Sequence, residues 1–263
     1  NSLTSQEGTL KAIEQLHWLC PTHTRRSEEA IALQQFSTPL PMAYIASVAA
    51  QISAADTVLE PSAGTGLLGV WAEIQQAKLI LNEIAPRRRE ILAAIFPKAT
   101  VSGHNAEQIH DYLDRKLQPT VVLMNPPFSA SPKMAKRNQF ATWKHVTSAL
   151  ARLQPGGRLV TITANWFSPL NHDWQDYFVR SQKTARVAFS AGIAGQAYAK
   201  HGTLIETRLT VIDKVPADNP VQFAECYQEV LRLPDLLGYV NLFVPPRAKL
   251  GDSEAQPATP GNP

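Results

Sequence analysis

The sequence predicts an α/β fold with a mostly parallel seven-stranded sheet, one antiparallel edge strand, helices on both faces and an N-terminal helical extension. Three observations predict it. Short apolar runs alternate with helical segments between residues 57 and 213, a glycine-rich turn joins the first run to an apolar helix, and the first 50 residues have helical periodicity throughout.

The segment 1–50 contains apolar side chains at helical spacing, and Pro21 ends the first of its helices. A cap residue followed by a proline, Thr38-Pro39, starts another helix that continues to about residue 51. We expect this segment to pack on a core formed by residues 51–214. The apolar residues that define the first helix are Leu10, Ile13, Leu16 and Leu19.

The core has seven apolar runs of strand type, separated by segments of helical type. The last two runs are joined without a helical period, which favours an antiparallel pair at the sheet edge. Residues 215–244 read as a C-terminal extension, and 245–263, with five prolines and no aromatic residue, as a disordered tail. The expected strands are 57–59, 78–81, 99–102, 120–124, 158–164, 185–190 and 204–213, and the expected helices are 67–76, 86–95, 109–117, 140–153 and 174–181.

Composition excludes several classes of protein. With 44% hydrophobic and 18% charged residues the composition is that of a globular protein. The chain has no membrane-spanning apolar stretch, and its first residues lack the basic-then-apolar pattern of a signal peptide. Two distant cysteines, Cys20 and Cys226, rule out a disulfide framework and fit a cytoplasmic protein. The histidines lack metal-ligand spacing, so we expect no metal site. A net charge of +3 permits a polyanionic partner.

The glycine-rich turn 64–69 matches G-x-G-x-x-G, with Glu83 lying 17 residues beyond Gly66. This pattern fits a dinucleotide site, an S-adenosylmethionine site or a tight turn without a ligand. Glu60 ends the preceding strand, and its charge would repel a pyrophosphate but attract the ammonium of a methionine moiety. Glu83 suits a ribose diol, while Ile84 and Asn105 suit the face and edge of an adenine.

The most specific motif is Asn125-Pro126-Pro127-Phe128, directly after the fourth apolar run. Two prolines remove backbone donors and stiffen the loop, leaving the side-chain carbonyl of Asn125 and a proline carbonyl as acceptors. Phe128 adds an aromatic face. Together these groups suit a planar amine. The alternative is a stiff loop whose phenylalanine packs in the core, because it would have the same sequence.

These stretches, with Phe36-Ser37-Thr38-Pro39 before them, resemble the N6-adenine DNA methyltransferases that use S-adenosylmethionine. The resemblance covers about residues 30–214 and implies a Rossmann-like fold. It also implies direct methyl transfer to a flipped-out adenine, with Asn125 and Pro126 holding the amine and Phe128 stacking on the base. The implied cofactor contacts are Phe36, Thr38, Pro39, Glu60, Ala63, Gly64, Gly66, Glu83, Ile84, Asn105, Ala106 and Asn125. The implied catalytic set is Asn125, Pro126, Pro127 and Phe128.

Several alternatives stay open. The substrate could be an RNA base amine or a protein glutamine amide, and the chain could be a cofactor-binding scaffold or anti-defence module; an NAD-dependent oxidoreductase is a further alternative. Lys133, Lys136 and Arg137 either contact nucleic-acid phosphates or form a solvated face. No compact recognition domain is visible, so we expect a specificity subunit or an additional domain. The missing initial Met fits a module of a larger plasmid or phage methyltransferase-helicase protein.

Overall fold

The structure is a computed structural model of the 263-residue chain, and it describes residues 2–20, 38–127, 136–196, 205–224 and 226–248. None of the helices in these ranges combines the length and the apolarity that crossing a membrane requires. The same part of the chain holds no cluster of three or more His, Cys, Asp or Glu side chains that could bind a metal ion, and Cys20 is a free thiol.

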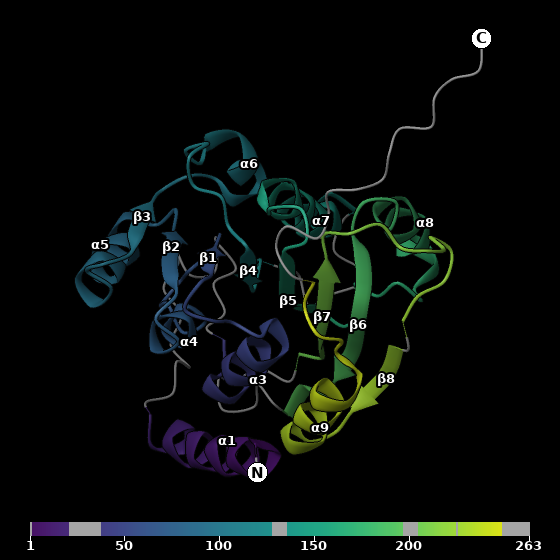
Figure 1. Cartoon of the computed structure of the whole chain (residues 1–263), viewed down its shortest axis with the longest axis horizontal. Helices are drawn as coiled ribbons and strands as arrows, with labels where there is room; N and C mark the ends of the chain where they lie inside the picture. Colours follow the sequence, from purple (N-terminus) through teal and green to yellow (C-terminus); the bar gives the residue numbers. More distant parts are fainter. Residues whose placement is uncertain (1, 21–37, 128–135, 197–204, 225, 249–263) are drawn as a thin grey trace.

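The fold is an α/β sandwich around one sheet, as predicted (Figure 1). The strand order across the described sheet is β3-β2-β1-β4-β5-β7-β6-β8. Strands β1 to β5 run parallel to one another, and β7 runs antiparallel to both of its neighbours. The strands are β1 (Thr57–Glu60), β2 (Lys78–Asn82), β3 (Thr100–Ser102), β4 (Val121–Met124), β5 (Arg158–Ala164), β6 (Arg186–Ile193), β7 (Thr207–Asp213) and β8 (Cys226–Val230).

Two details of the predicted sheet are wrong. The described sheet has eight strands, because β8, within the segment read as a C-terminal extension, pairs in parallel with β6. The antiparallel strand β7 lies between β5 and β6 and not at an edge. The predicted antiparallel pairing of the last two core strands is confirmed. Pairing partners of this kind depend on the path of the whole chain, which local periodicity does not report.

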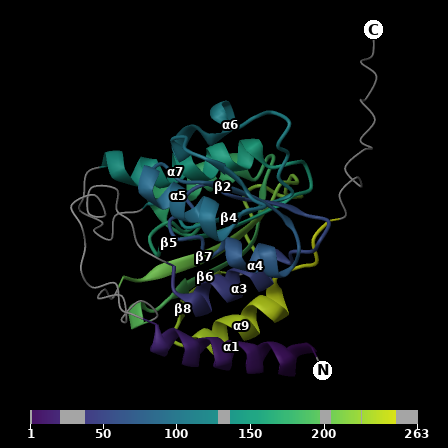
Figure 2. The same ribbon diagram turned by 90° about the vertical axis from the view of Figure 1, so that its left-hand side faces the viewer.

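Helices cover both faces of the sheet (Figure 2). Buried side chains from α3, α4, α5 and α9 form a core on one face, and those from α6, α7 and α8 form a second core on the other. Helix α1 packs outside α3 and α9. The helices are α1 (Ser2–Leu19), α3 (Leu40–Ala50), α4 (Gly69–Ile74), α5 (Pro86–Ile95), α6 (Ile109–Tyr112), α7 (Lys136–Arg152), α8 (His172–Ser181) and α9 (Leu233–Phe243), with a 3₁₀ turn η1 (Ala106–Gln108) before α6.

The central strands are apolar along their length because both faces are covered. Every residue of β4 and of β5 is buried, which removes apolar surface from water on both sides of the sheet. The buried Arg158 at the start of β5 is neutralised by Asp213 at the end of β7, with Nε 2.7 Å from Oδ1. This pair lies at the amino end of β5, on the side of the sheet opposite the carboxyl ends of β1 to β5.

Residues that follow β7 in the chain also belong to the folded core. Helix α9 packs against α3, and the guanidinium of Arg247 donates to both carboxylate oxygens of Asp56 at 2.8 Å. Of the tail predicted to be disordered, residues 245–248 are described, and the carbonyl of Pro245 accepts a hydrogen bond from Arg158. Residues 249–263 lie outside the described residues, so the rest of that prediction is untested.

Candidate active site

The carboxyl ends of β1, β2, β3 and β4 meet at one edge of the sheet because these strands are parallel and adjacent. The glycine-rich turn follows β1 there. Gly64 and Gly66 have φ angles of +55° and +79°, a backbone conformation that side chains with a Cβ rarely adopt. A Cβ on Gly66 would lie 2.5 Å from the ring of Phe96, so the turn is also packed tightly against α5.

Glu60, the last residue of β1, is buried with 2% of its surface exposed. Its Oε2 accepts a hydrogen bond of 2.9 Å from the backbone N–H of Gly69, at the start of α4. Burial raises the pKa of Glu60 well above the ordinary 4.5, and the nearby Glu83 carboxylate adds to the rise although the Gly69 N–H opposes it. A cationic group beside Glu60 would favour its charged form.

Glu83, the residue after β2, ties two turns together. Its Oε2 accepts from the N–H of Gly64 and its Oε1 from the N–H of Ala85, each at 2.8 Å. A carboxylate oxygen can accept more than one hydrogen bond, so each oxygen keeps capacity for a further donor such as a hydroxyl. The side chain therefore both closes the glycine turn and offers two acceptors beside it.

The residue that organises this edge is Asn82, to which sequence analysis assigned no role. Its amide donates to the carbonyls of Pro61 (2.9 Å) and His104 (2.8 Å), and its carbonyl accepts from Ser102 Oγ (2.9 Å) and from the N–H of His104. The side chain is 1% exposed. In the sequence, the signal for this role is an amide residue, Asn82, that directly follows a run of apolar residues.

Three further predicted cofactor contacts, Ile84, Asn105 and Ala106, lie beyond the carboxyl ends of β2 and β3. Ile84 is 49% exposed and offers an apolar surface, while Ala106 is buried. Asn105 caps η1, because its Oδ1 accepts from the N–H of Glu107 at 3.0 Å. The exposed amide group of Asn105 thus keeps its N–H donors for a ligand.

The predicted catalytic loop begins directly after β4. Asn125 is partly exposed, and its Nδ2 donates a hydrogen bond of 2.9 Å to Oγ1 of Thr38, although 87 residues separate the two. Thr38 lies just before α3, and α3 packs on β4 and β5. The structure therefore joins the predicted loop to the Thr38-Pro39 segment, and Pro126 is buried.

Some predicted residues cannot be placed. Phe36, Phe128 and Lys133 lie outside the described residues. Lys136 and Arg137 start α7, and their side chains are outside the described part of the structure. The prediction that these basic residues contact nucleic acid therefore stays a prediction.

An aromatic cluster is formed by side chains of α7, of the segment after β5 and of α8. Phe167 is fully buried, whereas Phe140 is 38% exposed and Trp166 is partly exposed. The ring of Phe140 lies edge-on to that of Tyr177, with 5.8 Å between centroids, and the Arg180 guanidinium lies 4.9 Å from the Tyr177 centroid. Partly exposed aromatic rings are the kind of side chain on which nucleic-acid bases stack.

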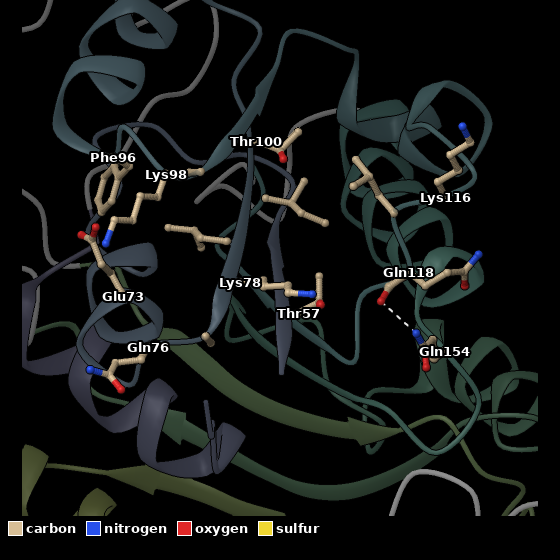
Figure 3. Close-up of a pocket in the computed structure, with 15 residues that line it drawn as sticks. Thr57, Glu73, Gln76, Lys78, Phe96, Lys98, Thr100, Lys116, Gln118 and Gln154 are labelled. Atoms are coloured by element: carbon tan, nitrogen blue, oxygen red, sulfur yellow. Dashed lines mark hydrogen bonds between the residues drawn. The ribbon is translucent and has the colours of Figure 1, made fainter. Parts of the chain in front are cut away.

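A cavity of about 860 Å³ lies away from these residues (Figure 3). Thr57, Lys78 and Thr100, the first residues of β1, β2 and β3, line it, so it lies at the amino ends of the strands. Lys98 and Lys116 also border it. The predicted site lies at the carboxyl ends, and this cavity is separate from it.

The groups at the carboxyl edge fit an S-adenosylmethionine molecule. An exposed apolar side chain at the tip of one strand and an amide at the tip of the next suit an adenine, and the Glu83 carboxylate between them and the turn suits a ribose diol. The two positive-φ glycines let the backbone approach a ligand without an intervening Cβ.

The sequence model of one family, described as the methyltransferase small domain, matches residues 44–188. No curated protein matches the sequence.

Solved structures share the fold at low sequence identity. A modification subunit of a putative type I restriction enzyme from Vibrio vulnificus is 18% identical, with a TM-score of 0.54 over 69% of this chain and 45% of its own. A type I restriction-modification methyltransferase subunit from Streptococcus thermophilus is 15% identical (TM-score 0.58, 79% and 52%). A putative RNA methyltransferase from Pyrococcus horikoshii is 17% identical (TM-score 0.58, 81% and 99%). The chain thus spans about half the length of these two type I subunits.

Proposed function

The chain belongs to the methyltransferase small domain family and uses S-adenosylmethionine, and on this premise we propose that it methylates the exocyclic N6 amine of adenine in DNA. The observation that carries the proposal is the hydrogen bond from Asn125 to Thr38, which engages the amide nitrogen and leaves the Asn125 carbonyl as an acceptor. An acceptor on a proline-stiffened loop suits a substrate with N–H groups.

In this mechanism the Asn125 carbonyl and the Pro126 carbonyl accept the two N–H groups of the target amine. The lone pair of an aromatic amine is delocalised into its ring, so the free amine is a poor nucleophile. Hydrogen bonds to these carbonyls favour a tetrahedral nitrogen and stabilise the positive charge that develops on it. The bound cofactor supplies an electrophilic methyl group. Asparagine is no base, so the proton leaves to water after transfer.

Four side chains would hold the cofactor beside this loop. Glu83 would accept the ribose hydroxyls, Ile84 would cover the adenine face, and Asn105 would donate to the adenine edge. Glu60 would sit near the ammonium of the methionine part. Holding donor and acceptor in line is a large contribution to catalysis in reactions of this type.

A nucleic-acid substrate is supported by the aromatic cluster of Phe140, Trp166 and Tyr177, which offers partly exposed rings next to α7. A base within a duplex is out of reach and must flip out of the stack, and Phe128 is expected to stack on it. DNA is favoured over RNA by the resemblance of the Phe36-to-Pro39 segment. We also propose that a specificity subunit or an additional domain reads the target sequence, which the likeness to type I modification subunits supports.

The test is transfer from methyl-labelled S-adenosylmethionine to DNA that lacks adenine methylation, with RNA and protein extracts in parallel. We expect label in N6-methyldeoxyadenosine after digestion. Asn125→Ala should lower the rate about 100-fold or more, the usual cost of losing one preorganised hydrogen-bond partner, and leave cofactor binding largely intact. Asn219→Ala, in an exposed loop, is the matched control.

Other outcomes contradict the proposal in different ways. Label only in RNA or only in a glutamine amide would keep the chemistry and replace the substrate. Cofactor binding without transfer to any of the three, together with unchanged biological activity of Asn125→Ala in cells, would favour a scaffold. Long-read sequencing of DNA from expressing cells would show whether methylation recurs at one sequence.

A further inference from the structure

We propose that Thr38 is a positioning residue for Asn125, whose amide it holds so that the carbonyl oxygen faces the target amine. The inference rests on the proposed function and deepens it. The resemblance implies a cofactor contact for Thr38, whereas the 2.9 Å hydrogen bond from Asn125 Nδ2 to Thr38 Oγ1 connects it to the methyl acceptor side of the reaction.

Thr38 is a rigid partner. It is 7% exposed, and the following Pro39 has a fixed φ of −59°. The carbonyl of Pro39 accepts from the N–H of Ala43 at 2.9 Å, which anchors the start of α3, and Met42 and Ala43 are fully buried. The position of the Thr38 hydroxyl is therefore set by a helix packed into the core.

Asn125 needs such a partner because its backbone alone does not orient its side chain. The proline that follows restricts Asn125 to extended backbone conformations, so the main freedom left lies in the side-chain torsions. A primary amide has a donor end and an acceptor end on opposite sides. When Nδ2 donates to Thr38, Oδ1 is left for the substrate, while the flipped amide would set its N–H groups against those of the amine.

The matched pair of variants is Thr38→Val, which keeps shape and loses the hydroxyl, and Thr38→Ser, which keeps the hydroxyl. We expect Thr38→Val to lower kcat about tenfold, the cost of one lost hydrogen bond, with the KM for S-adenosylmethionine changed less than about twofold. Thr38→Ser should restore most of kcat. Circular dichroism and thermal melting would show that each variant is folded.

Thr161→Val is the control for the same substitution elsewhere. Thr161 lies in β5 beside β4, is fully buried, and its hydroxyl has no hydrogen-bond partner among the described residues. We expect its kcat to equal that of the wild type. An unchanged kcat for Thr38→Val, or a raised KM for the cofactor at unchanged kcat, would overturn the proposal and return Thr38 to a structural or cofactor role.

A readout without activity separates this inference from the proposed function. In nitrogen-15 spectra, the Asn125 side-chain NH₂ signals can be assigned by their loss in Asn125→Ala. They should exchange slowly with solvent in the wild type and fast in Thr38→Val, with Thr38→Ser close to the wild type. Equal exchange in wild type and Thr38→Val would refute the positioning role even if DNA is methylated. Failure to methylate DNA would refute the proposed substrate alone.

Discussion

Glu83 accepts a hydrogen bond from the backbone N–H of Gly64 at 2.8 Å, so the carboxylate at the tip of β2 closes the glycine turn that follows β1. The second carboxylate oxygen accepts from Ala85. A single side chain thus holds the turn by a hydrogen bond and places two carboxylate oxygens beside it. This arrangement explains why a charged residue is tolerated with only 5% of its surface exposed.

Because Glu83 would accept the ribose hydroxyls of S-adenosylmethionine, we expect Glu83→Gln to weaken binding of the cofactor about 10- to 100-fold. Hydrogen bonds to a charged acceptor contribute about 1.5–3 kcal/mol. Isothermal titration calorimetry measures the effect. Glu73→Gln makes the same change on the exposed surface of α4 and should leave the affinity unaltered. An equal loss in both variants would show that general charge, and not this contact, governs binding.

Alanine substitutions at Gly66 and Gly156 separate two destabilising effects of a new side chain, which are steric overlap and an unfavourable backbone angle. Their φ angles are +79° and +77°, but a Cβ on Gly66 would lie 2.5 Å from Phe96, whereas one on Gly156 would have nothing within 4 Å. We expect Gly156→Ala to cost about 1–2 kcal/mol from the angle and Gly66→Ala about 1–3 kcal/mol more from overpacking. Urea unfolding of both variants checks this difference.

The buried Glu60 predicts a pH dependence of stability. A carboxyl whose pKa is raised on folding adds stability below its unfolded pKa of 4.5, and that stability is lost as the pH rises through the folded value. Glu60→Gln stays neutral and can still accept from Gly69. The stability of the wild type relative to Glu60→Gln should therefore fall as the pH rises above 4.5 towards the raised folded pKa. Parallel curves in urea titrations would show that Glu60 keeps an ordinary pKa.

The pair of Asp56 and Arg247 predicts the opposite trend at acid pH. Burial alone would raise the pKa of Asp56, but hydrogen bonds from Arg247, Thr120 and Ser53 outweigh it and lower the pKa from 3.8 to about 2. A lowered carboxyl pKa stabilises the fold above 3.8, here by about 2 kcal/mol, and this stability is lost as the pH falls through about 2.

Arg247→Gln should remove the part of that stabilisation which Arg247 contributes at neutral pH, and its difference from the wild type should shrink in acid. Arg232→Gln breaks a similar two-point contact with Asp235, but on the surface, where screening by water leaves little to lose. Denaturant unfolding at several pH values measures both variants. Equal effects would mean that the burial of Asp56 contributes nothing.

The sequence by itself was sufficient for the features that depend on neighbouring residues. The apolar runs of β1, β2, β4 and β5 and the proline that starts α5 carry their own structural preferences. The glycine turn after β1, the acid after β2 and the Asn125 loop after β4 could be placed at one edge because parallel strands present their carboxyl ends together. Strand β8 was missed because its assignment depends on pairing with the distant β6, and helix α9 because it contains the poor helix formers Gly238 and Asn241.

Only the tertiary structure decided which distant residues meet. That Thr38 receives the amide of Asn125, that Asn82 joins the ends of β1 and β3, and that β7 inserts between β5 and β6 depend on how helices and strands pack over the whole chain. Such contacts join groups far apart in the sequence, and their geometry is set by the sum of many burial and hydrogen-bond energies, which no local pattern encodes.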